Sequence, residues 1–156
     1  NMPVVNSGVA GDTTDDILSD MKNRVYDYNP SKVFLLIGTN DLRDEKSVAE
    51  VIDNIKKIIE EIKLNRSESE IYLESIYPVN KNINKKLVGA RENDDINKIN
   101  EEIEKYTKEQ DITFIDTHEL LVDEDGLLKE DYTDDGLHLN DEGYEVVSKT
   151  LEKYLN

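Results

Sequence analysis

Cysteine is missing from this sequence, and basic residues are few beside the acidic ones. Without cysteine the chain can form no disulfide, no thiolate metal site and no cysteine nucleophile. Lys and Arg number 19 against 36 Asp and Glu, which gives a formal net charge of −17. Because a negative field of this size repels nucleic acid and anionic membrane surfaces, we expect neither as a partner.

Long hydrophobic runs are missing as well. No apolar stretch approaches the roughly 20 residues that span a bilayer, so we expect no integral membrane segment. The 156 residues fit one domain, and no internal repeat, low-complexity tract or linker divides them. The sequence leaves open a signal peptide, the cellular compartment and the oligomeric state.

Short apolar runs alternate with longer amphipathic stretches, which favours β-α-β units around a parallel sheet. Four runs predict strands: 4–5, 33–37, 71–76 and 112–115. The run 33–37 is continuously apolar and stops at Gly38, as expected of a strand buried on both faces. The fold class predicted is therefore α/β, a three-layer α/β/α sandwich with a parallel sheet.

Apolar residues at helical spacing predict four helices, over 14–28, 48–62, 96–106 and 144–154. The candidate caps are Ser47 or Asp44 for the second helix and Asn140 or Asp141 for the last. The stretch 80–88 is polar and rich in Lys and Asn, so it is expected to be a mobile loop.

The first candidate catalytic motif is Asp134-Asp135-Gly136-Leu137-His138. A histidine that takes a proton from a hydroxyl needs a carboxylate on its far ring nitrogen, to fix its tautomer and orientation. Asp135 and His138 can supply both from one loop. Asp134 is the rival carboxylate, and a solvated loop histidine is the alternative interpretation of His138.

Two other motifs follow predicted strands. Asn40 stands in Gly38-Thr39-Asn40-Asp41, and Gly11 opens Gly11-Asp12-Thr13-Thr14. An asparagine amide and a glycine backbone N–H can both donate to the oxyanion of a tetrahedral intermediate, and glycine allows close approach. The alternatives are an asparagine that suits a turn or helix cap, and an ordinary turn glycine. Ligands of doubly wound sheets bind at the carboxyl ends of strands, where both motifs lie.

Together these three motifs resemble the SGNH (GDSL-type) ester hydrolases, which are marked by four ordered blocks giving Ser, Gly, Asn and Asp-x-x-His. Gly11, Asn40 and the Asp135–His138 pair match the second, third and fourth blocks in order and approximate spacing. The resemblance implies a flavodoxin-like sheet, an oxyanion hole from Gly11 and Asn40, and a base pair of His138 with Asp135. It implies no metal and no cofactor.

The first block departs from that family, because no Gly-Asp-Ser follows a strand anywhere in the 156 residues. In the family the Ser-bearing strand lies between those predicted over 4–5 and 33–37. Several buried backbone groups would otherwise go unsatisfied, at about 1–3 kcal/mol each. We therefore expect a single domain over 1–156 that is incomplete at its N-terminus. The natural protein should carry about 20–40 more residues, the usual size of a β-α unit, or a second polypeptide should supply the strand.

The resemblance implies a serine hydrolase of small or medium acyl esters, inactive without that Ser. Its substrate would be a small molecule, with a lysolipid or an acylated sugar left as alternatives. The competing hypothesis is a non-catalytic carbohydrate- or lipid-binding module that kept the scaffold and lost its nucleophile. Ser7 is the serine beside a block, but it is not in a Gly-Asp-Ser turn. His118 has no motif around it and is expected at the surface or in a helix cap.

Overall fold

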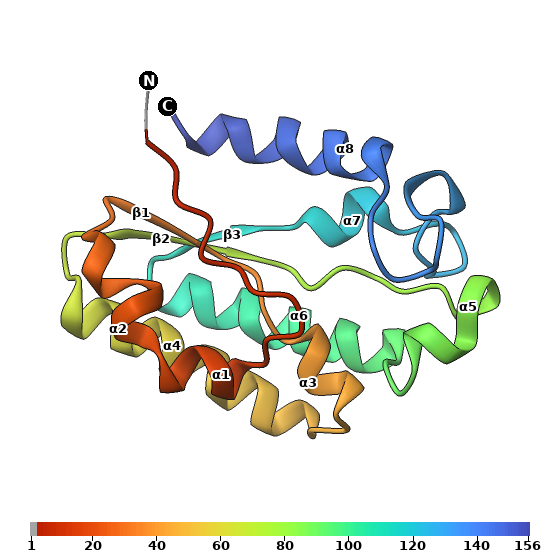
Figure 1. The fold of residues 1–156 in the computed structure, drawn as a ribbon, viewed down its shortest axis with the longest axis horizontal. Coiled ribbons are helices and arrows are strands. Elements are labelled where there is room, and N and C mark those ends of the chain that lie inside the picture. Colours follow the sequence, from red (N-terminus) through yellow and green to blue (C-terminus); the bar gives the residue numbers. More distant parts are fainter. Residues whose placement is uncertain (1–2) are drawn as a thin grey trace.

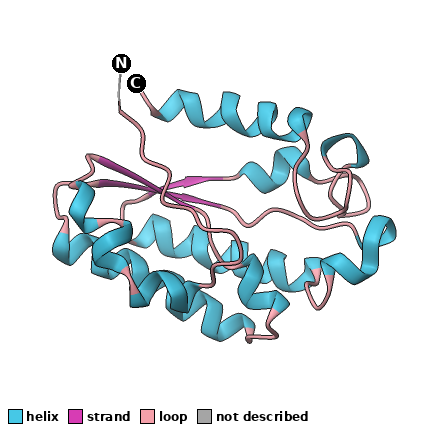
Figure 2. Ribbon diagram, in the orientation of Figure 1, coloured by secondary structure: helices cyan, strands magenta, loops and turns pink. Residues whose placement is uncertain are grey.

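The computed structural model describes residues 3–156 and builds them around a parallel sheet (Figure 2). The sheet has the order β1-β2-β3, with β1 at Lys32–Leu35, β2 at Glu70–Glu74 and β3 at Thr113–Ile115. In the register, Val33 stands opposite Ile71 and Tyr72 opposite Thr113. All three strands run parallel, so their carboxyl ends meet at one edge, as the α/β prediction requires.

Helices cover both faces of the sheet, which confirms the three-layer prediction (Figure 1). One layer contains α1 (Thr14–Ser19), α2 (Met21–Arg24), α4 (Val48–Asn65) and α6 (Asn93–Glu109). The opposite layer contains α7 (Thr117–Leu121) and α8 (Asp141–Leu151). The remaining helical elements are α3 (Thr39–Arg43), α5 (Lys81–Val88), η1 (Tyr26–Tyr28), η2 (Glu130–Tyr132) and η3 (Glu152–Tyr154). No helix within residues 3–156 is both long and apolar enough to cross a membrane.

The core lies mainly between the sheet and α4 and α6. Ile55, Ile58 and Ile59 of α4 are fully buried, as their helical spacing predicts. The predicted cap Ser47 is confirmed, since its side chain and Glu50 form a reciprocal capping box at the start of α4. Asn140 caps α8 in a similar way, accepting from the Gly143 N–H at 3.0 Å.

The strand predicted over residues 4–5 is wrong. Val4 and Val5 are 76% and 54% exposed and lie in an extended segment that belongs to no strand. A strand holds its geometry through ladder hydrogen bonds, and no other segment of residues 3–156 pairs with this one. The burial expected for 33–37 is also only partly found: Val33 and Phe34 are half-buried, and Leu36 is 38% exposed.

Two further predictions need correction. The single helix expected over 14–28 is broken into α1, α2 and η1, because the backbone of Asp20 leaves helical geometry at φ −136°. Its carboxylate accepts from Asn23 and Arg24, local bonds of the kind that compete with a continuous helix. The mobile loop expected over 80–88 is instead α5, kinked at Asn84 and anchored by the fully buried Val88.

Candidate active site

Asp135 and His138 meet within one loop, as their spacing predicted. Asp135 Oδ2 lies 2.7 Å from His138 Nδ1, while Asp135 Oδ1 accepts from the backbone N–H groups of Leu137 and His138 at 2.9 and 2.8 Å. Both carboxylate oxygens are therefore held. Asp134, the rival carboxylate, is exposed and forms no hydrogen bond with the ring within the described chain.

The loop keeps its shape because Gly136 lies directly against the start of α5. Its φ is +82°, and a Cβ added there would lie 2.2 Å from the Asn80 carbonyl oxygen. The Asn80 N–H donates to the Gly136 carbonyl at 2.7 Å, so the two backbones are bonded as well as packed. The buried Thr133 Oγ1 donates to the His138 carbonyl at 2.7 Å and accepts from Gly136 N–H at 2.9 Å.

Hydrogen bonding keeps Asp135 ionised. Partial burial pushes its pKa upward, but the bonds from the His138 ring and from the two backbone N–H groups outweigh that effect. The net pKa lies below the ordinary aspartate value. A carboxylate that stays negative can hold the Nδ1–H of His138, which leaves Nε2 as the nitrogen available for proton transfer.

Asn40 lies in the first turn of α3, directly after β1 and Gly38. Its Nδ2 donates to the Asp12 carbonyl at 2.9 Å, and its Oδ1 accepts from Arg91 Nη2 at 2.9 Å. An amide nitrogen carries two hydrogens, so the second N–H of Asn40 remains available to a ligand. Gly11 has φ +87°, a backbone conformation that favours glycine, and its N–H donates no hydrogen bond within residues 3–156.

The Gly11–Thr14 and Gly38–Asp41 motifs are locked together by neighbouring side chains. Besides the bond from Asn40 to Asp12, the fully buried Asp41 accepts from the Thr14 N–H at 2.9 Å and from its hydroxyl. Asn54 Nδ2 also donates to Thr14 Oγ1 at 2.9 Å. These buried bonds fix the two candidate oxyanion donors relative to one another before any ligand arrives.

Gly11, Asn40 and His138 line one cavity of about 590 Å³ at the carboxyl end of the sheet. The structure thus brings together all four predicted residues, with Asp135 behind the His138 ring. Apolar side chains form much of the remaining wall: Val9, Ile17, Leu36, Ile37, Ile76, Val79, Leu137 and Leu139. Ser7 lines the same cavity, but its hydroxyl donates to the Arg24 carbonyl at 2.8 Å.

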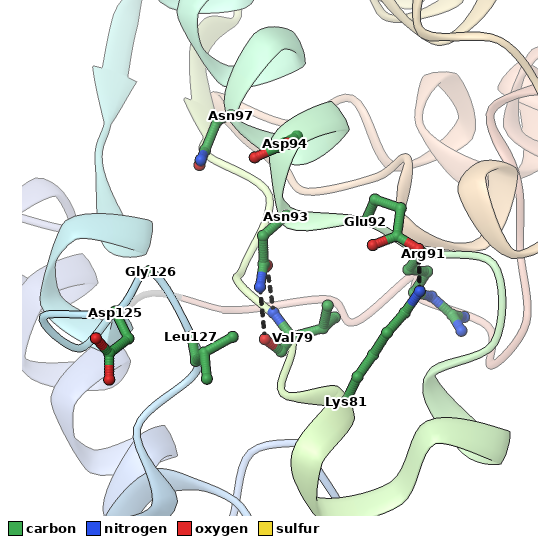
Figure 3. A pocket seen from close by; sticks show the side chains of 10 residues that line it. All are labelled: Val79, Lys81, Arg91, Glu92, Asn93, Asp94, Asn97, Asp125, Gly126 and Leu127. Atoms are coloured by element: carbon green, nitrogen blue, oxygen red, sulfur yellow. Dashed lines mark hydrogen bonds and ion pairs between the residues drawn. The ribbon is translucent and has the colours of Figure 1, made fainter.

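A second cavity, of about 350 Å³, adjoins the first across Val79 and Arg91, which line both (Figure 3). Seven of its ten lining residues are polar or charged. Asn93 holds both backbone groups of Val79, accepting at 2.9 Å and donating at 2.8 Å, and Lys81 pairs with Glu92. The apolar residues of the larger cavity suit an acyl group, and the polar residues that line the smaller cavity suit a hydrophilic alcohol.

Next to the site, the buried Glu74 pairs with the half-buried Tyr77. Tyr77 lines the larger cavity and donates its hydroxyl to Glu74 Oε2 at 3.1 Å. Burial raises the pKa of Glu74, although Tyr77 and Thr117 hydrogen bonds oppose it. Burial, followed by the nearby Glu74 charge, also raises the pKa of Tyr77.

Three residues near the site were not singled out from the sequence: Arg91, Asn80 and Asp41. They are 2%, 2% and 0% exposed and act through tertiary contacts, which leave no periodic signal in the sequence.

His118 lies in the first turn of α7 and lines neither cavity. Its half-buried ring has a pKa lowered by burial, against the opposing charge of Asp116. Within residues 3–156, no three His, Asp or Glu side chains gather as a metal site requires.

A model of the GDSL-like Lipase/Acylhydrolase family matches residues 1–146, so the chain belongs to this family. The family takes its name from lipases and acylhydrolases, which are hydrolases broadly of ester type. The resemblance inferred from Gly11, Asn40 and the Asp135–His138 pair is thereby confirmed as to family.

Individual relatives share the fold. A Streptococcus pneumonia protein, provisionally described as a platelet activating factor, superposes with a TM-score of 0.90 at 35% identity, over 97% of this chain and 72% of that one. A GDSL-like lipase from Bacteroides thetaiotaomicron VPI-5482 gives a TM-score of 0.82 at 26% identity, over 94% and 72%.

A curated protein, the N-acylneuraminate cytidylyltransferase of Escherichia coli O18:K1:H7 (strain RS218 / NMEC), is 36% identical over 123 residues. The match covers 76% of this chain but 27% of that protein, so the chain spans about a quarter of that relative's length.

Proposed function

We propose that this protein is a carboxylic ester hydrolase that works through a serine acyl-enzyme, without metal or cofactor. His138 is the general base, Asp135 orients it, and Gly11 and Asn40 form the oxyanion hole. The observation that carries this proposal is the shared cavity: His138, Asn40 and Gly11 line it, and His138 Nδ1 lies 2.7 Å from the Asp135 carboxylate.

The chemistry follows from which groups are free. His138 Nε2 takes the proton of the seryl hydroxyl as its oxygen attacks the ester carbonyl, and the carbonyl oxygen becomes an oxyanion. The second Nδ2–H of Asn40 and the Gly11 N–H donate to that oxyanion. Nε2 then returns the proton to the departing alcohol, leaving an acyl-serine. Water repeats the sequence to release the acid and free the serine.

The nucleophile, in this proposal, is a serine on a strand that pairs with the outer edge of β1. Three observations support it. β1 is an edge strand among the described strands, and parallel sheets are normally covered at their edges. Val33 and Phe34 are only half-buried. Val4, Val5 and Leu36 are exposed apolar residues, and the proposal is that the added strand covers them.

The substrate class we favour is an acylated sugar of the N-acylneuraminate type. The support is the similarity to a cytidylyltransferase named for N-acylneuraminate, together with the polar and charged residues that line the smaller, adjoining cavity. A lysolipid is the second candidate, because many of the residues that line the larger cavity are apolar. Hydrolysis rates on an O-acetylated N-acetylneuraminate and on a lysophospholipid, measured side by side, decide between them.

The proposed reaction is tested with p-nitrophenyl acetate and the full-length natural protein. We expect hydrolysis, and His138→Ala should lower kcat by at least about 10³-fold, as expected for loss of a triad member. Asp135→Ala and Asp134→Ala are a matched pair of neighbouring carboxylates, of which only the first should impair turnover. Full turnover in His138→Ala would exclude the assignment, and no hydrolysis by the wild type would favour the non-catalytic binding module.

A further inference from the structure

Arg91 is the least expected charged group near the site. It lies in the loop between α5 and α6 and is 2% exposed. No carboxylate within residues 3–156 forms an ion pair with its guanidinium. A buried cation without an anion partner is costly, and such groups are retained mainly where they serve a role.

The guanidinium donates to four acceptor atoms on three residues, one of which is Asn40. Nε donates to the Thr39 carbonyl and hydroxyl at 2.9 and 3.0 Å, and Nη1 donates to the Val88 carbonyl at 2.9 Å. Nη2 donates to Asn40 Oδ1 at 2.9 Å. Figure 3 shows the Arg91 side chain running past the second cavity, while Lys81 and Glu92 pair beside it.

This contact decides which end of the Asn40 amide faces which neighbour. An arginine N–H can only donate, and the Asp12 carbonyl on the other side can only accept. A flipped amide would set donor against donor and acceptor against acceptor. Asn40 Oδ1 must therefore face Arg91, and Nδ2 must face Asp12 and the cavity.

We infer that Arg91 is a positioning residue for the oxyanion hole, a role that rests on the proposed function. It holds the Asn40 amide in the orientation that presents Nδ2–H. By donating to Oδ1 from a charged group, it also polarises the amide and strengthens Nδ2–H as a donor. Its positive charge lies one side chain away from the place where the oxyanion forms.

Kinetics on the full-length protein test the catalytic half of this inference. Arg91→Met should lower kcat on p-nitrophenyl acetate about 10-fold to 100-fold with little change in KM, because the strengthened contact forms in the transition state. In an Asn40→Ala background, the same substitution should change kcat by less than about twofold, since Arg91 acts through Asn40. Independent, multiplying effects would overturn the inference.

Two further variants separate positioning from folding. Arg91→Lys keeps the positive charge and a donor group, so it should retain more of kcat than Arg91→Met. If Arg91→Met unfolds, the kcat of Arg91→Lys is the measurement that tests positioning. Arg66→Met is the control: Arg66 is half-buried whereas Arg91 is buried, and Arg66 also donates to a backbone carbonyl, that of Tyr26, but it lines neither cavity. It should leave kcat unchanged. Equal losses in Arg91→Met and Arg66→Met would reduce Arg91 to a structural role.

The side-chain amide signals of Asn40 in an NMR spectrum need no ester and no nucleophile, so they test the contact even if the proposed function fails. We expect Arg91→Met to shift both Asn40 Nδ2 proton signals and speed their exchange with water, and Arg66→Met to leave them in place. Unchanged Asn40 signals in Arg91→Met would overturn the inference, whatever the enzyme assay shows.

Discussion

Gly136 supports the loop that carries Asp135 and His138, and replacing it tests that support. Its φ of +82° disfavours any residue with a side chain, and an alanine Cβ would lie 2.2 Å from the Asn80 carbonyl oxygen. That oxygen belongs to backbone which is itself bonded to Gly136, through the 2.7 Å contact from Asn80 N–H. Neither the Gly136 loop nor the Asn80 backbone can move apart to make room without breaking this hydrogen bond.

Gly126 provides a control in the same chain. Its φ is +80°, yet nothing lies within 4 Å of the Cβ that alanine would add. An alanine with positive φ costs the folded state about 1–2 kcal/mol. Replacing glycine by alanine also lowers the conformational entropy of the unfolded chain, which stabilises the protein by about 0.4–1 kcal/mol. Gly126→Ala should therefore destabilise by roughly 0–1.5 kcal/mol. Gly136→Ala carries the same strain plus overpacking of about 1–3 kcal/mol.

Urea unfolding, followed by the fluorescence of the eight tyrosines, measures both variants against the wild type. We expect Gly136→Ala to lose about 1–3 kcal/mol more than Gly126→Ala, and we expect its kcat to fall because His138 moves with the loop. Equal free energies of unfolding in the two variants, within about 0.5 kcal/mol, would show that the close approach of Gly136 to Asn80 is not rigid.

Two more predictions concern the site and its surroundings. Asn40→Ala should lower kcat on p-nitrophenyl acetate by about 10²–10³-fold with little change in KM, because an oxyanion contact forms mainly in the transition state. A pure KM effect would instead make Asn40 a substrate-binding residue. Burial raises the pKa of Glu74, so the folded protein holds the Glu74 proton more tightly than the unfolded chain does. The protonated Glu74 therefore contributes to stability at low pH. This contribution is lost as pH rises above about 4.5 through the folded pKa. Relative to wild type, Glu74→Gln should therefore remove part of the fall in unfolding free energy over that range in urea titrations, and parallel curves would contradict the assignment.

The sequence predicted those parts of the fold whose signals are local. Strand β2 contains a short apolar run, helix α4 carries apolar residues at helical spacing, and Ser47 before that helix is a residue type that favours caps. The site residues were predictable for a related reason. Asp135 and His138 are three residues apart, so one loop can bring them together, and they meet at 2.7 Å.

The sequence could not predict features that depend on distant contacts. Asn80 lies in a polar stretch that suggests a loop, but tertiary bonds to Gly136 and Leu128 bury it. Arg91 resembles any surface arginine until the fold places it against Asn40. Val4 and Val5 suggest a strand by composition, yet a strand needs a neighbour to pair with, and none lies beside them within residues 3–156.

The central claim is that a serine beside β1 forms an acyl-enzyme, activated by His138. Mass spectrometry of the full-length protein, quenched in acid during turnover of p-nitrophenyl acetate and then digested to locate any acetyl group, tests it most directly. We predict one added acetyl group on the serine of a Gly-Asp-Ser turn, and none in His138→Ala. Turnover without any covalent adduct, or an acetyl group on Ser7, would contradict the mechanism proposed for this cavity.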